Sequence, residues 1–173
     1  DVLIDNQSTA RLLLACPKSD SLSTNESSDL LHAWNDLEVL SAIPRIVQAT
    51  QEQFVPQMVN FESVAGVDFK KGCYPGQEIV ARSQYRGTIK RRLYLAKART
   101  SDLPLPGTEI FAANDPEQPC GLVVLASLDP GQSDWVYLQI ECKTELARQA
   151  IHLGSSTGTQ LEFLSLPYPL IEI

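Results

Sequence analysis

The chain has 173 residues, 43% of them hydrophobic and 20% charged, which is typical of a globular protein of one or two domains. A net charge of −7 argues against a surface that binds nucleic acid throughout, and no apolar run reaches the ~20 residues of a membrane-spanning helix. The four cysteines form no CxxC and the two histidines have no spaced partner, so neither a disulfide framework nor a built-in metal site is predicted. We expect a cytoplasmic protein that makes no membrane contact and no direct contact with nucleic acid.

The beginning of the chain predicts a hairpin and a loop. Residues 2–16 contain two short apolar runs around a polar turn, which indicate a hairpin, although the second run also suits a buried strand of a larger sheet. The polar, serine-rich stretch 17–29 is typical of a surface loop. The chain opens without an initiator Met or a signal peptide, and we take it to be a piece of a longer protein.

Helical patterns follow this loop. A helix is predicted from about residue 28 to at most 43, because apolar residues recur at three- and four-residue spacing and Pro44 disfavours helical dihedrals before it. We expect a second short helix within 46–54 and an extended stretch at 58–61.

A further helix is predicted over 76–84. Pro75 suits its first position and Gly87 is placed to end it, beyond its last turn. We expect Ile79 and Val80 to face inward.

Just before this helix lies Cys73, the best candidate for a reactive group. Lys70 and Lys71, the mobility that Gly72 gives to the loop, and the nearby helix N-terminus all favour the thiolate, which is the nucleophilic form. The alternative is an inert cysteine, an interpretation we adopt for the other three, Cys16, Cys120 and Cys142. Neither histidine lies near Cys73 in sequence and no phosphate-binding glycine motif occurs, so a Cys/His hydrolase or a nucleotide-binding protein has little support.

The window 70–92 is strongly basic. It holds seven of the 14 lysines and arginines but a single acid, Glu78, giving a formal charge of +6 against −13 for the rest of the chain. The seven bases are Lys70, Lys71, Arg82, Arg86, Lys90, Arg91 and Arg92. Arg86, Lys90, Arg91 and Arg92 could receive a phosphate or a carboxylate-rich ligand, and a solvated turn at a domain junction explains them equally well.

From residue 93 onward the sequence predicts strands. Alternating apolar residues and regular turn signals indicate short strands at 93–98, 108–113, 121–128, 134–141 and 160–166. A short helix is predicted over 143–149. Several strands at this spacing favour a small antiparallel β-barrel.

The segment Lys71-Gly72-Cys73-Tyr74-Pro75-Gly76-Gln77-Glu78 closely resembles K-G-C-Y-x-G-Q-E, the signature of the YgfZ-type folate-binding proteins. The resemblance covers about residues 43–93. These proteins are relatives of the glycine-cleavage T-protein, an aminomethyltransferase. Three departures are Pro75, where the family often has Thr, Ser41-Ala42, where relatives commonly read A-G, and Leu40, where the T-protein has an acid.

The resemblance implies an α+β fold, with residues 1–92 forming the C-terminal part of a folate-binding (GcvT-like) domain and residues 93–173 an antiparallel β-barrel. It implies tetrahydrofolate or a derivative as cofactor, iron–sulfur client enzymes as partners, and a missing N-terminal part of the same protein. The residues matching the family's functional positions are Lys71 and Cys73 for the chemistry, with Gly76, Gln77 and Glu78 beside them. We expect the bases of the window to lie near the anionic tail of folate or near a partner: Arg86, Lys90, Arg91 and Arg92.

Three functions follow as hypotheses. The first is a folate-binding protein that supports iron–sulfur enzymes and, through them, tRNA modification, with Cys73 as an exposed thiolate. The second is a folate-dependent aminomethyltransferase, against which Leu40 counts because that reaction needs a carboxylate. The third is a binding or scaffold module whose thiol is incidental.

Overall fold

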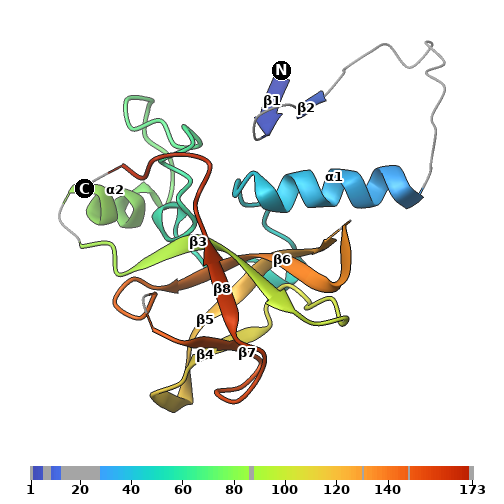
Figure 1. The fold of residues 1–173 in the computed structure, drawn as a ribbon. Coiled ribbons are helices and arrows are strands. Elements are labelled where there is room, and N and C mark those ends of the chain that lie inside the picture. The colour runs from blue at the N-terminus through green and yellow to red at the C-terminus, as the bar shows by residue number, and fades with distance from the viewer. Residues whose placement is uncertain are drawn as a thin grey trace.

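The computed structural model describes residues 2–5, 9–12, 28–85, 88–129, 131–147 and 149–171. Its first half contains the strands β1 (Val2–Asp5) and β2 (Thr9–Leu12), the helices α1 (Ser28–Leu40) and α2 (Gln77–Tyr85), and the 3-10 turns η1 (Gln48–Thr50) and η2 (Pro56–Val59). The second half is a run of strands: β3 (Arg91–Arg99), β4 (Glu109–Ala112), β5 (Asp115–Asp129), β6 (Gln132–Lys143), β7 (Ile151–Leu153) and β8 (Leu161–Leu164). Figure 1 shows these later strands below the helices, and β1 and β2 above α1.

The six later strands form one antiparallel sheet in the order β7-β4-β5-β6-β3-β8. The sheet curls until its two edges approach each other, where His152 and Gln160 form an isolated bridge. A register shift between Val123 and Leu125 marks an irregularity in β5, which is the kind of feature that bends a strand. The predicted barrel is therefore confirmed in its coarser form, as a curled, half-barrel antiparallel sheet within an α+β fold.

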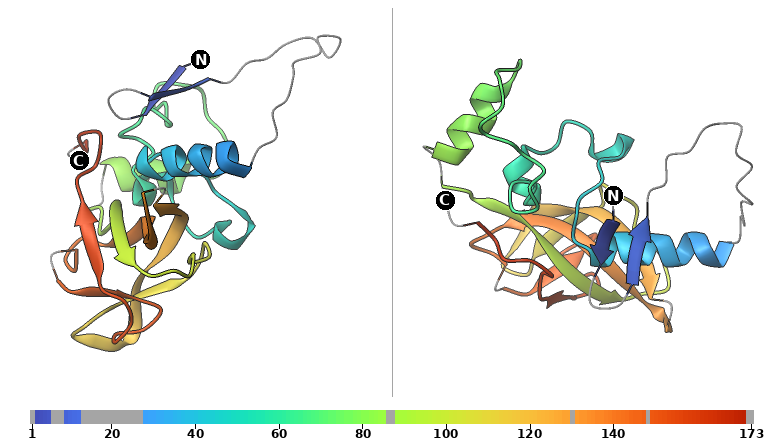
Figure 2. Two further views of the ribbon diagram at one scale, coloured as in Figure 1. Left: turned by 45° about the vertical axis from the view of Figure 1, so that its right-hand side comes forward. Right: turned by 90° about the horizontal axis from the view of Figure 1, so that it is seen from above.

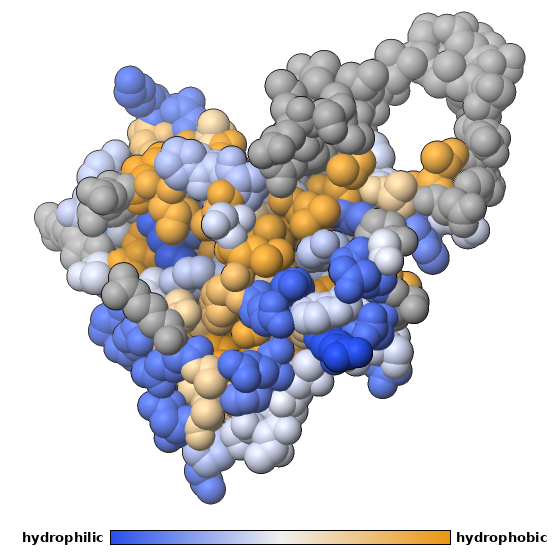
Figure 3. Space-filling view, viewed as in Figure 1, coloured by the Kyte–Doolittle hydropathy of each residue, from blue (hydrophilic) through white to orange (hydrophobic). Residues whose placement is uncertain are grey.

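Each face of this sheet packs against its own apolar cluster. In β3, Ala96 and Ala98 face one cluster, while Leu93 and Leu95 face the other, as the alternation of a strand requires. The second cluster also takes in Val39 of α1 and Val59 of η2, so the helical half is packed onto the sheet. α1 packs onto β5 and β6, whereas α2 lies toward the opposite end, against η2 (Figure 2), with apolar residues at the surface between the two helices (Figure 3).

The end of α1 is fixed to the sheet by one buried side chain. Gln139 of β6 donates from Nε2 to the carbonyl oxygens of Glu38 and Val39, at 3.0 Å each, and to that of Ile43 at 3.3 Å. These contacts satisfy carbonyl groups that a helix end leaves without intrahelical partners. The predicted helix is confirmed, and it ends at Leu40.

Other local predictions have mixed outcomes. β1 and β2 pair antiparallel from Val2–Leu12 to Asp5–Thr9, which confirms the hairpin over the described part of 2–16. Residues 17–27 of the predicted loop 17–29 lie outside the described residues. The helix within 46–54 shortens to the single turn η1. Neither α1 nor α2, among the described residues, combines the length and apolar character that crossing a bilayer requires.

Two predictions of local structure are wrong. The stretch 58–61 is not extended: η2 begins with Pro56 at its first position, where a missing N–H costs nothing, and Asn60 ends it with φ 58°. The helix predicted over 143–149 is replaced by turns, since β6 runs to Lys143 and the N–H of Leu146 bonds back to Lys143 at 3.1 Å. In both cases pairing across the tertiary structure overrides the local pattern.

Candidate functional site

The loop that carries the family-like motif lies on the surface and leads into α2. Within it, the backbone N–H of Lys70 donates to Asp68 Oδ1 at 2.8 Å. The backbone N–H of Tyr74 donates to Gln77 Oε1 at 3.4 Å, and the N–H of Gln77 returns a bond to the Tyr74 carbonyl at 3.3 Å. Gly76 has φ 85°, a conformation that a glycine adopts without strain. The loop is thus closed onto the first turn of α2.

Cys73 is exposed in this loop and forms no disulfide. Lys71 beside it is also exposed, and its Nζ lies 5.0 Å from the ring centroid of Tyr74, at cation–π distance. Cys120 and Cys142 are buried in β5 and β6, and a hydrogen bond to Cys120 together with burial holds the pKa of the Cys142 thiol above its ordinary value. Of the cysteines that the structure describes, Cys73 alone is open to solvent, while Cys16 lies outside the described residues.

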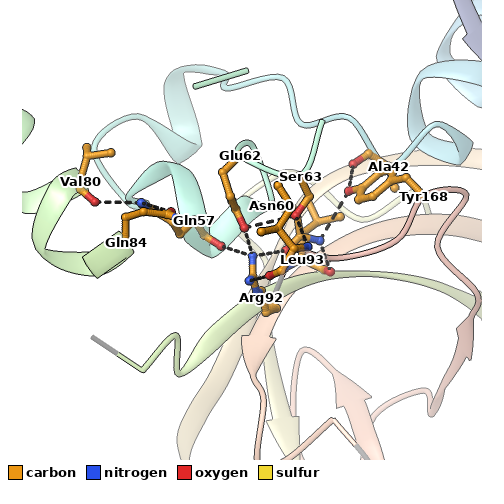
Figure 4. Close-up of polar contacts among 11 residues, drawn as sticks. Ala42, Gln57, Asn60, Glu62, Ser63, Val80, Gln84, Arg92, Leu93 and Tyr168 are labelled. Atoms are coloured by element: carbon orange, nitrogen blue, oxygen red, sulfur yellow. Dashed lines mark hydrogen bonds and ion pairs between the residues drawn. The ribbon is translucent and has the colours of Figure 1, made fainter. Parts of the chain in front are cut away.

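α2 is attached to the rest of the protein through few contacts. Gln57 of η2 donates from Nε2 to the carbonyl of Val80 at 2.9 Å and to Gln84 Oε1 at 3.4 Å (Figure 4). Val80 is the helix's buried residue, as predicted, but Ile79 is 61% exposed, so its predicted inward position is wrong. The helix presents Ile79 to solvent because its contact with η2 is made by the turn around Val80.

Arg91 is committed to an ion pair. Its Nε and Nη2 donate to the two carboxylate oxygens of Glu141 on β6, and Nη2 also reaches the Cys120 carbonyl at 3.2 Å. The hydrogen bonds that Arg91 donates to Glu141 hold the pKa of its guanidinium above its ordinary value. In this arrangement Arg91 fixes β3 to β6 at the place where the basic segment joins the sheet.

Arg92 is buried and committed as well. Its Nη1 donates to the buried carboxylate of Glu62 and, at 3.3 Å, to the Gln57 carbonyl, while Nη2 donates to the carbonyl of Ile171 at 3.1 Å. Figure 4 shows this guanidinium between the loop after η2 and β3. Arg92 therefore holds the helical half to the sheet and to the end of the chain.

Asn60 completes the same network. Its side chain donates to the Leu93 carbonyl at 2.8 Å and accepts from the Leu93 N–H at 3.3 Å, as a neighbouring strand would (Figure 4). Tyr168 lies beside it, and its hydroxyl donates to the Ala42 carbonyl at 2.7 Å. Burial raises the pKa of Tyr168. These contacts join the residues after α1, the loop after η2 and the last described segment.

The remaining basic residues of the window 70–92 are exposed and available for binding, as far as the structure describes them. Lys70, Lys71, Arg82 and Lys90 are exposed, and none forms an ion pair with another residue in the described part of the chain. Arg86 lies outside the described residues. The structure thus places Lys71, Cys73, Gly76, Gln77 and Glu78 together at the start of α2, and separates them from the engaged pair Arg91 and Arg92. Arg82, absent from the predicted site, could have been found from its place in the basic window.

Metal ligands do not gather in this region. Across the described residues, no group of three or more His, Cys, Asp or Glu side chains is arranged to hold a metal ion. What the geometry offers is an exposed thiol and uncommitted cations, suited to nucleophilic or ligand-exchange chemistry at sulfur beside an anion.

The fold and the loop together define an α+β protein whose curled sheet supports a surface thiol set in a basic segment. No family model matches the chain. Over 173 residues it is 31% identical to the tRNA-modifying protein YgfZ of three Escherichia coli strains, O45:K1 (S88), O81 (ED1a) and UTI89, a match that covers 99% of this chain and 51% of each relative. The chain is therefore a YgfZ homologue along nearly its whole length, and it spans about half the length of these curated relatives.

Proposed function

We propose that the chain is the C-terminal portion of a YgfZ-like protein that binds tetrahydrofolate and supports the assembly or repair of iron–sulfur enzymes. Through those enzymes it would serve tRNA modification, the role that the names of its E. coli relatives state. In this proposal residues 1–92 complete a folate-binding domain and residues 93–173 form the barrel-like domain beyond it.

The observation that carries the proposal is the exposure of Cys73 within the motif. An exposed thiol beside Lys71 is accessible to a client protein, whereas the buried thiols Cys120 and Cys142 are not. The loop also starts α2, whose N–H groups favour negative charge nearby. We assign Cys73 the reactive role and Lys71 the role of favouring its thiolate.

The residues present fit the anionic part of a folate. Lys90 is an exposed cation without a described ion-pair partner and could receive its carboxylates, as could Arg86. Arg91 and Arg92, whose guanidinium groups are held by Glu141 and Glu62, would contribute by positioning the segment.

Gly76, Gln77 and Glu78 would shape the approach to the thiol at the start of α2. Tetrahydrofolate, when bound, supplies one-carbon chemistry. The alternative, an aminomethyltransferase, needs a carboxylate where Leu40 packs against the core.

The test is genetic complementation with the complete protein in cells that lack it. Cys73→Ala should leave thermal stability unchanged, because the side chain is exposed, yet abolish rescue of an iron–sulfur enzyme's activity. Cys120→Ala removes a buried thiol instead and should retain rescue. Full rescue by Cys73→Ala would refute the assigned role, and a positive one-carbon transfer assay would favour the aminomethyltransferase.

A further inference from the structure

A cavity of about 390 Å³ opens between α2, η2 and the segment that leads into β3. Val55 and Met58 contribute apolar surface from the η2 side, and Ile89 contributes it from the segment before β3. Its volume lies at the lower end of the range for small-molecule sites, ~300–1,000 Å³, which are mostly apolar with a few polar groups. The space is therefore suited to a compact ring system.

Positive charge lines this cavity from two elements. Arg82 comes from α2 and Lys90 from the segment before β3, and neither forms an ion pair with another described residue. No acidic residue is among those that line it within the described chain, although acids outnumber bases 21 to 14 overall. The third base, Arg91, is already neutralised by Glu141. The cavity thus combines two positive charges that have no described ion-pair partner, those of Arg82 and Lys90, with an apolar lining.

An unused acceptor borders the same space. Gln57 lines the cavity and is almost fully buried, with Nε2 held by Val80 and Gln84. Its Oε1 is buried and has no hydrogen-bond partner among the described residues. A buried acceptor of this kind costs free energy unless a water or a ligand donor satisfies it.

We propose that this cavity binds a small aromatic anion: a flat apolar ring that contacts Val55, Met58 and Ile89, with a carboxylate or phosphate held by Arg82 and Lys90. A ring N–H or O–H that reaches Gln57 would add specificity. The cavity is distinct from the loop of Cys73. It shares Lys90 with the folate site proposed above, but its charge and apolar lining do not require folate as the ligand.

The test uses 2-naphthoate as probe and its neutral counterpart, 2-naphthalenemethanol, titrated into the ¹⁵N-labelled chain. Naphthoate should shift the amide resonances of residues 82–85 and 88–91, and the neutral analogue should bind about tenfold more weakly. Arg82→Gln and Lys90→Gln should each weaken naphthoate binding by about tenfold and leave the neutral analogue unaffected. Lys70→Gln, which removes an exposed charge elsewhere, is the matched control and should change neither.

Two further arms complete the experiment. Equal affinities for naphthoate and its neutral analogue, or amide shifts confined to residues outside 82–91, would overturn the proposal. Tetrahydrofolate is added to the naphthoate complex to distinguish folate from another aromatic anion as the ligand of this cavity. Displacement identifies folate as an occupant of this cavity, and retention of naphthoate identifies another aromatic anion; either outcome supports the site.

Discussion

The ion pair between Arg92 and Glu62 gives the sharpest test of how the basic segment is built. Both side chains are almost inaccessible, with 8% of Arg92 and 0% of Glu62 exposed, and the guanidinium also serves the carbonyls of Gln57 and Ile171. Arg92→Met keeps most of the side chain's volume but leaves the carboxylate of Glu62 buried without its partner.

The cost follows from the burial. Removing one member of a buried ion pair destabilises a protein by about 3–5 kcal/mol, because the other charge stays desolvated. For a chain of this size about 1 kcal/mol shifts the melting temperature by ~2–4 °C, so we expect a fall of roughly 6–20 °C. Replacing both residues, Arg92→Met with Glu62→Leu, should recover at least half of the loss.

Thermal and urea unfolding, followed by circular dichroism, measure these differences. Arg99→Met is the matched control: it makes the same substitution on the same strand, but in a pair with Asp134 whose side chains are 73% and 50% exposed. An exposed pair contributes about 0–1 kcal/mol, so the control should unfold nearly as the wild type does. If Arg92→Met were as harmless as Arg99→Met, the guanidinium would be dispensable to the fold, and the assignment of Arg92 as a structural residue would fail.

Three further predictions test other parts of the structure. Iodoacetamide should alkylate Cys73 in the folded protein and reach Cys120 and Cys142 only after unfolding; peptide mass spectrometry that finds the three modified at similar rates would contradict their burial. Burial raises the pKa of Asp36 above its ordinary value of 3.8, so the folded protein holds this proton to a higher pH than the unfolded chain does, and the free energy of unfolding falls as the pH rises above about 4. Asp36→Asn should therefore be more stable than the wild type at pH 7 and lose this advantage below about pH 4. A stability difference that does not change with pH would refute burial of the Asp36 carboxyl as its cause. An alanine Cβ at Gly121 would overlap the Glu141 carbonyl, so Gly121→Ala should cost about 1–3 kcal/mol in urea unfolding, against almost nothing for Gly72→Ala, where the added atom meets open space.

Much of the helical and strand pattern could be predicted because it depends on local spacing. α1 and α2 follow from apolar periodicity and from residues suited to helix ends, and the strands follow from alternation between turns. The error at 58–61 arose because Val59 and Phe61 look like a strand, while Asn60 actually pairs through its side chain with Leu93.

The candidate site could be predicted only in part, for a related reason. The local motif correctly put Cys73 on an exposed loop before a helix. Whether an arginine or lysine of the window forms an ion pair depends on residues far away in sequence, such as Glu141 for Arg91 and Glu62 for Arg92. The local sequence pattern does not predict these partners. Composition could show that the window is basic, but only the fold separates the bases that build the sheet junction from those that are exposed without an ion-pair partner among the described residues.

We propose that this chain belongs to a folate-binding protein, and calorimetric titration of the complete protein with tetrahydrofolate tests this proposal most directly. We predict saturable binding of one tetrahydrofolate per molecule, weakened by Lys90→Gln and unchanged by Arg99→Gln, whose charge lies at the far end of β3. The absence of any saturable binding at millimolar tetrahydrofolate would contradict the account.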